Sequence, residues 1–361
     1  MKNSFGNAIN ISLFGESHGA GVGVLIDGIS PGVRVDEDFI AHQLTLRRPS
    51  GSISTARREA DNFVIQSGVF NGYTTGAPLC IFIPNTDAQS HDYNPELPRP
   101  SHADLTAREK YHGYEDYRGG GHFSGRVTAA LVAAGAIVIP AMREMGIYVG
   151  TYIKEIGNTA LSSPEHKKEA LLAVAESKYG IISDTELAEI TDIIERAAQD
   201  GDSVGGKLET AVIGLPAGLG EPWFDGVESQ IAKAVFGIPA VKAISFGAEN
   251  ISSLPGSLAN DAIVLKDGKI ITETNNSGGV QGGITNGMPL VFRTTVKPTP
   301  SIAKEQQTVN ISTHKESSIS IRGRHDPCIV PRARIVIDSV TALVIADMLT
   351  VRYGSDALTK R

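Results

Sequence analysis

Residues 119–145 read GGGHFSGRVTAALVAAGAIVIPAMREM, and the fold is organised around this stretch. From Gly125 to Met145 the sequence is rich in alanine and apolar on all sides, which predicts a central buried helix. Three glycines, 119 to 121, stand just before the expected helix start near Ser124. The glycine run is open to two interpretations: a flexible turn, or an anion cradle in which backbone N–H groups lie at the positive end of the helix dipole.

Strand-like segments lie on both sides of this helix in the sequence. Residues 9–13 alternate between apolar and polar, and residues 22–26 are apolar and β-branched. Residues 79–83 and 205–214 are also expected to form strands. Because strands and helices mix without regular βαβ alternation, the pattern predicts one large α+β domain spanning residues 1–361.

Further helices are expected towards the surface and at the end of the chain. An amphipathic helix begins at Asp36, residues 164–200 carry two surface helices, and residues 334–351 form a closing helix. The expected caps and terminator of the two surface helices are Ser163, Asp184 and Gly201. The turn-rich segment 85–122 shows little periodicity and reads as a long functional loop.

The amino-acid composition restricts the class of ligand and the cellular compartment that we expect for this chain. The net charge of the 361-residue chain is -7, which argues against a general nucleic-acid surface, yet its arginines occur in pairs. A chain that is acidic overall but has clustered arginines is better suited to bind a small polyanion than a nucleic acid. Two cysteines give neither a disulfide framework nor metal-ligand spacing. The first residues lack the apolar stretch of a signal peptide, and the apolar run 129–142 is too short to span a bilayer. We therefore expect a cytoplasmic protein without a metal, a membrane or a nucleic acid as partner.

Two runs near the ends of the chain share one composition, GESHG at residues 15–19 and RGRHDPC at residues 322–328. In each run a histidine lies close in sequence to glycine or proline. These residues fix the geometry of a loop, so that its polar side chains can be held in a defined orientation. Between them lie Arg47-Arg48, RPSH at 99–102, GGGHFSGR at 119–126 and KPTPS at 297–301. Together these motifs predict a catalytic site for a highly phosphorylated or carboxylated ligand.

Other motif interpretations are weaker. Residues 15–19 match G-x-S-x-G, but the hydrolase elbow needs a helix directly after it, whereas residues 21–27 are strand-like. The glycines at 19 and 21 begin like a dinucleotide fingerprint, but Val24 replaces the third glycine. The histidines lack H-E-x-x-H spacing, so a metal site is not expected.

Individual site residues keep two interpretations at this level. His18 and His102 are either structural histidines or general acids that work near neutral pH. Asp326 is either an arginine-paired structural carboxylate or a proton acceptor held by Pro327. The pair Arg47-Arg48 is either a solvated helix end or an anion clamp.

Taken together, the motifs resemble the chorismate synthase family over nearly the whole chain. The matching runs are residues 15–19, 47–49, 99–104, 116–126, 201–206, 216–222, 278–283, 297–302 and 323–332. The resemblance implies a lyase of the shikimate pathway that converts 5-enolpyruvylshikimate 3-phosphate to chorismate by anti-1,4-elimination of phosphate. It also implies reduced FMN (FMNH2) as a cofactor that is not consumed, an external flavin reductant, a β-α-β sandwich of antiparallel sheets enclosing helices, and a homotetramer.

The resemblance also assigns roles by motif match. His18 would act as general acid near the leaving phosphate, His102 would protonate or stabilise the reduced flavin, and Asp326 would assist proton removal. The implied substrate-binding residues are Arg47, Arg48, Arg99, Arg126 and Arg324. The implied cofactor-binding residues are His122, Phe123, Ser124, Ala240, Gly282, Lys297, Pro298, Thr299, Pro300, Ser301 and Arg324.

The chain departs from the family pattern close to the expected anion site. Leu46 stands where a third arginine before Pro49 is usual, and Ile53 replaces another common arginine. These losses argue against an NADP-type nucleotide site near Arg47. The usual GGGRSSAR is GGGHFSGR at residues 119–126.

Overall fold

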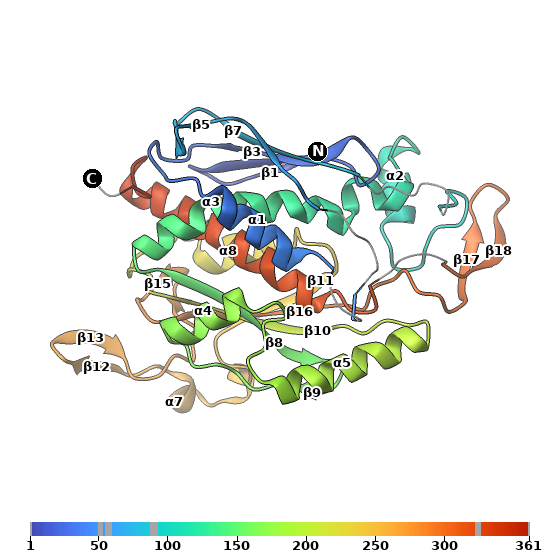
Figure 1. Cartoon of the computed structure of the whole chain (residues 1–361). Helices are drawn as coiled ribbons and strands as arrows, with labels where there is room; N and C mark the ends of the chain where they lie inside the picture. The colour runs from blue at the N-terminus through green and yellow to red at the C-terminus, as the bar shows by residue number, and fades with distance from the viewer. Residues whose placement is uncertain (1, 50–52, 55–59, 87–92, 322–325, 360–361) are drawn as a thin grey trace.

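Two five-stranded antiparallel sheets enclose a layer of helices in the computed structural model of the chain (Figure 1). The structure describes residues 2–49, 53–54, 60–86, 93–321 and 326–359. The first sheet has the order β1 (Ser4–Phe5), β2 (Asn10–Gly15), β3 (Gly21–Asp27), β7 (Leu79–Pro84) and β4 (Val64–Ser67). The second has the order β11 (Val241–Phe246), β16 (Leu290–Val296), β10 (Gly206–Ile213), β8 (Tyr148–Ile156) and β9 (Thr159–Ala160).

The helices between the sheets form the core. They are α1 (Glu37–Arg47), α3 (Thr128–Glu144), α6 (Val227–Val235) and α8 (Val330–Tyr353). Helix α3 contacts β3 and β7 of the first sheet, and α8 contacts β8 and β10 of the second. Where α3 meets α8, a Cβ on Gly135 would lie 2.4 Å from the Cβ of Ser339, so this glycine permits the close approach of the two helices.

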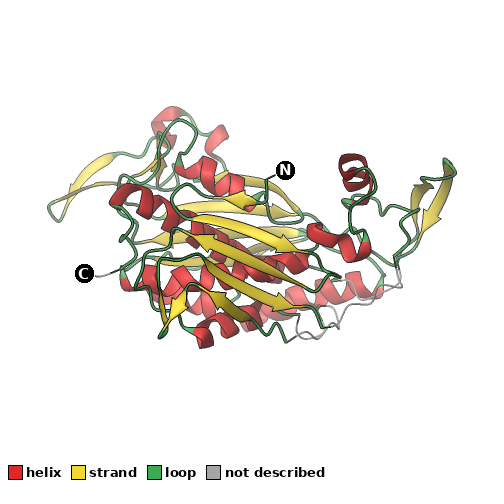
Figure 2. Cartoon of the chain, turned by 90° about the horizontal axis from the view of Figure 1, so that it is seen from above, coloured by secondary structure: helices red, strands yellow, loops and turns green. Residues whose placement is uncertain are grey.

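The remaining elements surround this sandwich. Helices α4 (Lys168–Glu176) and α5 (Asp184–Gln199) lie below the second sheet in Figure 1. The short helical elements are α2 (Asp104–Tyr111), η2 (Arg118–Phe123), η3 (Gly125–Val127), η4 (Ile251–Ser253) and α7 (Gly256–Ala259). The small hairpins are β5–β6 (Val69–Phe70, Tyr73–Thr74), β12–β13 (Ile263–Lys266, Lys269–Thr272), β14–β15 (Val280–Gln281, Ile284–Thr285) and β17–β18 (Gln306–Asn310, Lys315–Ile319). Hairpins β12–β13 and β17–β18 project from opposite ends of the molecule (Figure 2).

Most of the expected elements are confirmed. The alternating strand near residue 10, the two apolar strands β3 and β7, the buried helix α3 and the closing helix α8 are all present. Asp36 caps α1 by accepting a hydrogen bond from the backbone N–H of Phe39 at 2.9 Å. The α+β class and the sandwich of antiparallel sheets enclosing helices are confirmed as well.

Other local predictions are wrong. Helix α4 starts after Lys167, and Ser163 instead accepts a hydrogen bond from Lys154 at 2.9 Å. Ser183, one residue before Asp184, is the N-cap of α5. The presumed loop 85–122 contains α2 and part of η2, which its polar composition did not reveal.

The central helix is longer than its apolar run indicated. The helical stretch Gly125–Glu144 is, by length and hydropathy alone, able to cross a membrane. However, 72 % of its most apolar window is buried inside the protein. Its position between two sheets accounts for a composition that is apolar on all sides.

Candidate active site

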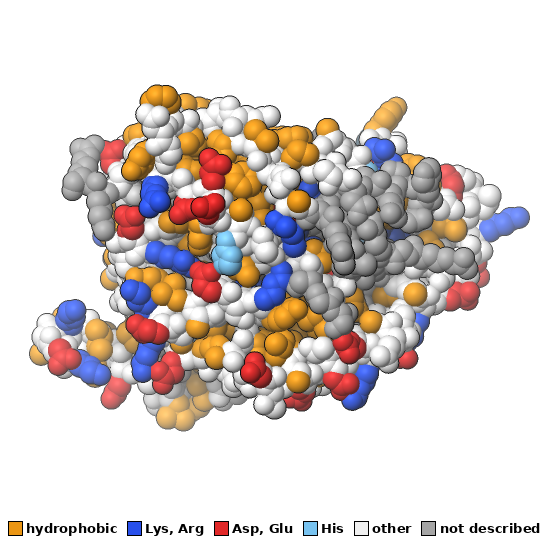
Figure 3. Space-filling model, in the orientation of Figure 1, with side chains coloured by type: hydrophobic (Ala, Val, Ile, Leu, Met, Phe, Trp, Pro, Cys, Tyr) orange, Lys and Arg blue, Asp and Glu red, His pale blue; other side chains and the backbone are white. Residues whose placement is uncertain are grey.

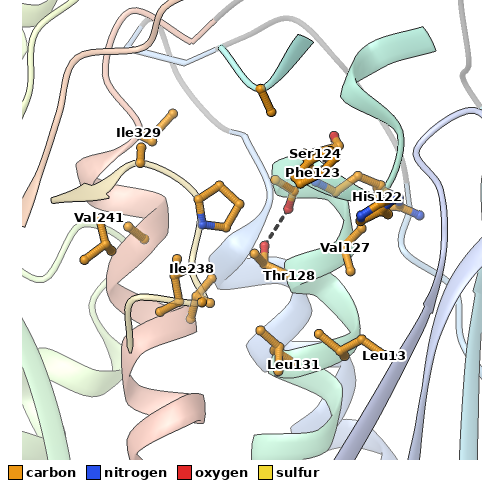
Figure 4. A pocket seen from close by; sticks show the side chains of 18 of the residues that line it. Leu13, His122, Phe123, Ser124, Val127, Thr128, Leu131, Ile238, Val241 and Ile329 are labelled. Atoms are coloured by element: carbon orange, nitrogen blue, oxygen red, sulfur yellow. Dashed lines mark hydrogen bonds between the residues drawn. The ribbon is translucent and has the colours of Figure 1, made fainter. Parts of the chain in front are cut away.

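A cavity of about 1200 Å³ opens where the ends of the helical layer meet loops from both sheets. One wall is apolar, and the side chains that form it come from β2, η3, α3, β11 and the segments before β11 and α8 (Figure 4). The apolar residues labelled there are Leu13, Val127, Leu131, Ile238, Val241 and Ile329. Arginine, lysine and histidine side chains line the same cavity, and we call this group its cationic rim.

Most of the sequence-predicted site residues line this cavity. They are Arg47, Arg48, Arg99, His102, His122, Phe123, Ser124, Arg126, Ala240, Lys297, Thr299, Pro300, Ser301 and Asp326. His18 and Pro298 are not among the lining residues, although each adjoins residues that are. Gly282 lies in the turn of the hairpin β14–β15, away from the cavity lining. Arg324 falls outside the described residues.

A buried carboxylate, Asp61, organises the arginines of the rim. Its Oδ2 accepts a hydrogen bond from Nη2 of Arg47 at 3.0 Å, and its Oδ1 accepts one from Nη1 of Arg126. Burial opposes the ionised form of Asp61, but the charges of Arg47 and Arg126 prevail and lower its pKa. Asp61 therefore stays ionised and balances two buried guanidinium groups.

The two arginines that Asp61 holds differ in their other contacts. Burial lowers the pKa of Arg47 to about 10, with Asp61 acting in the opposite direction. Arg126 also donates to Oδ1 of Asn85 at 3.0 Å and to the carbonyl of Pro84 at 3.1 Å. Both guanidinium groups are thus fixed in place at the cavity rim.

The end of α1, which carries Arg47 and Arg48, is capped by cations from distant segments. Nζ of Lys178 donates to the carbonyl oxygens of residues 45, 46 and 48 at 2.6, 3.0 and 2.8 Å. Nε of Arg332 donates to the carbonyl of Arg47 at 3.0 Å. Positive charge at a helix C-terminus also interacts favourably with the helix dipole.

Asp326 lies in this network through an ion pair with Arg332. Its side chain is 10 % exposed, so it is largely shielded from solvent at the cavity wall. Because Arg332 also binds the end of α1, Asp326 is coupled to the position of the arginines at that helix end. The structure therefore shows Asp326 as an arginine-paired carboxylate, and this carboxylate lies beside the cavity.

The three glycines 119–121 bring the two candidate histidines to one loop. All three have positive φ angles, of 59°, 85° and 51°. A Cβ on Gly119 would lie 2.5 Å from Nε2 of His18, and one on Gly120 would lie 3.0 Å from Cε1 of His102. The space that side chains would fill is therefore occupied by the two imidazole rings.

His18 is held among aromatic and charged neighbours. Its ring meets that of Tyr93 edge-on, with centroids 5.4 Å apart. The pKa of the nearby Asp116 is lowered, chiefly by its hydrogen bonds from Arg118 and to a smaller extent by the charge of His18. The adjacent Ser17 is buried and donates to the carbonyl of Arg118 at 3.2 Å, which agrees with the dismissal of a serine nucleophile.

His102 forms a compact charged group with two residues of the same loop. Its Nδ1 lies 2.6 Å from Oδ1 of Asp104 and 3.0 Å from Nη2 of Arg99. Arg99 in turn donates from Nε and Nη2 to the two oxygens of Asp104, both at 2.7 Å. Its Nη1 reaches Oγ of Ser301 at 3.3 Å, which links this loop to the segment 297–301.

The candidate cofactor segments lie near one another around the cavity. His122 and Phe123 pack with ring centroids 4.2 Å apart. The backbone N–H of Lys297 donates to the carbonyl of Ala240 at 2.9 Å, and Nζ of Lys297 donates to the carbonyl of Ser101. These contacts tie β11, β16 and the loop before α2 together at the rim.

Sequence reasoning missed Asp61, Asn85 and Lys178. Their partners are far away in the sequence: Asp61 pairs with Arg126 across 65 positions, and Lys178 reaches residue 45 across 133. No local motif marks such long-range contacts. The departures Leu46 and Ile53 are buried in the hydrophobic core and do not line the cavity.

Comparisons with known proteins agree on one family. A family model described as chorismate synthase matches residues 9–350. A curated chorismate synthase from Pyrococcus abyssi is 46 % identical over 351 residues, covering 96 % of this chain and 97 % of that protein. Another from Chitinophaga pinensis is 45 % identical over 361 residues and covers 99 % of each chain. A solved structure described as chorismate synthase has a TM-score of 0.76 and 28 % identity, covering 97 % of this chain and 94 % of that one.

Proposed function

The chain belongs to the chorismate synthase family, and we propose that its cavity binds 5-enolpyruvylshikimate 3-phosphate together with reduced FMN. As a lyase of this family, it acts in the shikimate pathway and forms chorismate by eliminating phosphate without net redox change. The observation that carries the proposed binding mode is that one cavity is lined both by apolar side chains and by several arginine, lysine and histidine side chains.

The residues present fit a flavin beside a polyanionic substrate. An isoalloxazine ring needs a flat apolar wall, which Leu13, Leu131 and Ile238 supply with their neighbours. Within the described part of the chain, Nε of Arg47, Nε of Arg48 and Oγ1 of Thr299 are buried without a hydrogen-bond partner. Such unpartnered polar atoms at a cavity wall suit ligands that bring phosphate and carboxylate oxygens.

Reduced FMN, when bound, supplies electron density that eases departure of the phosphate and is then recovered. The residues that would hold it are those of segments 122–124 and 297–301, with Ala240 and Arg324. Gly282 lies away from the cavity lining in this chain, so any contact it makes with the flavin would come from another subunit. A closed site lined by these segments would also exclude water.

The substrate carries two carboxylates and a phosphate, which need several cations. Arg47, Arg48 and Arg126 are proposed to hold them at the rim, with Arg324 as a further ligand. Arg99 is bound to Asp104 just as Arg47 and Arg126 are bound to Asp61, and it is proposed both to hold the substrate and to position its own loop. No nucleotide phosphate site of the NADP type is proposed near Arg47.

Three residues are proposed to handle protons. His18 is the general acid for the leaving phosphate, His102 protonates or stabilises the reduced flavin, and Asp326 assists removal of the proton from C6 of the substrate. General acid–base groups contribute roughly 10²–10⁴-fold to rate. Replacing each residue separately by alanine is therefore expected to lower kcat by this order while the protein still folds.

The test is steady-state kinetics on the three alanine variants, with folding checked by circular dichroism. Anaerobic titration with reduced FMN measures cofactor binding separately. Near-normal kcat in all three variants would remove the assigned roles. Loss of flavin affinity without a fall in kcat at saturation would assign the residue to binding instead.

The domain organisation, the oligomeric state, the cellular location and the source of reduced flavin are further proposals. We propose a single domain over residues 1–361, a homotetramer, a cytoplasmic location and an external source of reduced flavin. The hairpin β12–β13 supports an assembly role because Ile263, Leu265 and Ile270 on it are more than 70 % exposed (74 %, 75 % and 78 %). Hydrophobic and charged side chains are both exposed on this projecting arm (Figure 3). Sedimentation equilibrium measures the mass of the assembly directly.

A further inference from the structure

The hydrogen-bond pattern around His102 determines which of its ring nitrogens carries a proton. Nδ1 lies 2.6 Å from Oδ1 of Asp104. Burial would raise the pKa of Asp104, but hydrogen bonds from Arg99 and His102 outweigh burial and lower it, so the carboxylate is ionised and can only accept. At this distance from an ionised carboxylate, Nδ1 carries the hydrogen and donates it to Oδ1 of Asp104. Nη2 of Arg99 lies 3.0 Å from Nδ1 but can only donate, so its hydrogen goes to Oδ1 of Asp104, 2.7 Å away, rather than to the ring.

We propose that Asp104 is a positioning residue that holds His102 in the tautomer with hydrogen on Nδ1, leaving Nε2 as the atom that exchanges a proton with the group bound in the cavity. This inference rests on the proposed role of His102 in proton handling. The proton balance is simple. Nε2 gains one proton to form the imidazolium ion and returns one to the bound group, while the Nδ1–H stays on Asp104 throughout.

Arg99 makes the orientation of the carboxylate rigid. Its Nε and Nη2 bind the two oxygens of Asp104 at 2.7 Å, and its backbone N–H donates to Oδ2 at 3.0 Å. Bidentate pairing of this kind fixes the plane of the carboxylate as well as its position. Asp104 is therefore unable to rotate away from His102 without breaking three contacts to Arg99.

The position of the His102 ring agrees with separate roles for Nδ1 and Nε2. His102 lines both the 1200 Å³ cavity and a smaller one of about 280 Å³, whereas Asp104 lines only the smaller one. Among the described residues, the hydrogen bond that fits this tautomer of His102 runs from Nδ1 to Asp104. The ring thus lines both cavities, with Nδ1 towards Asp104 and with Cε1 and Nε2 beside Gly120.

A matched set of variants tests this role. Asp104→Asn keeps the shape but allows the amide NH2 group to face Nδ1, which favours the opposite tautomer. In serine proteases, the same change beside the catalytic histidine lowers kcat by roughly 10⁴-fold. We expect kcat to fall at least about 10²-fold here, and we expect Asp104→Asn to have little further effect in a His102→Gln background. Asp192→Asn, which alters an exposed pair with Arg196 on α5, is the control for the chemical change.

Nitrogen-15 NMR of histidine-labelled protein reads the tautomer without any substrate. The His102 signal is assigned by its loss in His102→Gln. In the wild-type protein, hydrogen on Nδ1 is the expected result, and hydrogen on Nε2 of the neutral ring would overturn the proposal. If Asp104→Asn fails to fold, Asp104→Glu keeps the charge and is expected to retain the Nδ1–H form.

The two readouts separate this inference from the proposed function. Normal wild-type turnover together with normal turnover of folded Asp104→Asn would contradict the positioning role and leave the family activity intact. Absence of turnover in the wild-type protein would contradict the proposed function, while the NMR signal would still decide the tautomer. Equal losses from Asp104→Asn in the presence and absence of His102 would also overturn the inference, since its effect would not pass through the histidine.

Discussion

At the scale of single residues, the glycine run 119–121 explains how two histidines distant in sequence reach one loop. His18 packs where a Cβ of Gly119 would lie, and His102 packs where a Cβ of Gly120 would lie. Positive φ angles at these positions also favour glycine over other residues. The run therefore serves the histidines directly, in addition to whatever anion its backbone binds.

This packing gives a selective prediction. Gly119→Ala should displace His18, and Gly120→Ala should displace His102. Each change is expected to lower kcat by about 10²-fold, because small displacements of catalytic groups have effects of this size. A left-handed alanine should also cost about 1–2 kcal/mol of stability.

Gly256→Ala on α7 is the matched control away from the cavity. A Cβ there has nothing within 4 Å, and Gly256 is not among the residues with positive φ. Steady-state kinetics on the three variants should show near-normal kcat for this one alone. If Gly119→Ala and Gly120→Ala behave like Gly256→Ala, the histidines do not depend on the glycine run.

Sequence motifs identified the residues that line the site better than they identified the residues that hold those side chains in place. His18, His102 and Arg126 stand in recognisable runs, and their chemistry was evident from those runs. Asp61 was not evident, because its role arises only when α1 and η3 bring Arg47 and Arg126 to it. A lone carboxylate in a sequence carries no sign of such long-range pairing.

At the scale of elements, the C-terminus of α1 is the part of the site whose position depends most on distant segments. Lys178 supplies three hydrogen bonds to its carbonyl groups, and burial, followed by the charges of Arg332 and Arg334, lowers the pKa of Lys178 to about 8. The amine is therefore close to its charged-to-neutral transition under mildly alkaline conditions. The end of α1 presents Arg47 and Arg48 to the cavity, so its position should affect substrate binding.

We predict that Lys178→Met raises the KM for substrate and leaves kcat nearly unchanged. The loss of hydrogen bonds from a charged donor should lower the free energy of unfolding by about 1–3 kcal/mol. Lys167→Met, which removes an exposed pair with Glu165, is the control and should change neither quantity. A fall in kcat at unchanged KM would contradict the role of Lys178 in holding the binding arginines.

Elements with long apolar periodicity were predictable, and their boundaries were less so. Helix α3 was evident because a helix buried between two sheets is apolar on all sides. The start of α4 was misjudged because Ser163 and Pro164 look like a helix start, while the chain continues without helix to Lys167. Helix α2 lacks any apolar face long enough to identify it, since Ala107 is its one buried residue.

At the scale of the whole molecule, charges buried in the helical layer make stability depend on pH. Oδ2 of Asp338 on α8 lies 3.6 Å from Nη1 of Arg334. Burial raises the pKa of Asp338 to about 6, although the charge of Arg334 acts in the opposite direction. The folded protein therefore retains the proton of Asp338 to a higher pH than the unfolded chain does. Stability from this group is fully present below about pH 4 and is lost as the pH rises through about 6.

We predict that Asp338→Asn removes this decline between pH 4 and 6. The measurement is the free energy of unfolding by urea at several pH values across that range. The slope with pH is the readout, because the amide also changes the partner of Arg334 and so shifts the absolute value. Asp192→Asn on the exposed face of α5 should leave the slope unchanged, and an unchanged slope in Asp338→Asn would show that Asp338 does not titrate in this range.

The overall class was predictable from the sequence, while the layered arrangement came from the resemblance. Alternating and apolar segments indicated α+β, but β11 and β16 were not identified, although Leu290–Val296 is rich in β-branched residues. Strand β16 pairs with β10 across about 80 to 90 positions, as in Val212 with Leu290, and β11 pairs with β16 across about 50 positions, so both pairings depend on the assembled core. The same long-range closure forms the cavity between the two sheets.

The central claim is that this cavity eliminates phosphate from 5-enolpyruvylshikimate 3-phosphate with the help of a flavin that is not consumed. The most direct test is an anaerobic assay with that substrate and chemically reduced FMN, in which phosphate, chorismate absorbance and reduced flavin are followed together. The account predicts equimolar phosphate and chorismate with no loss of reduced flavin. Net flavin oxidation, or tight FMN binding without product, would contradict it.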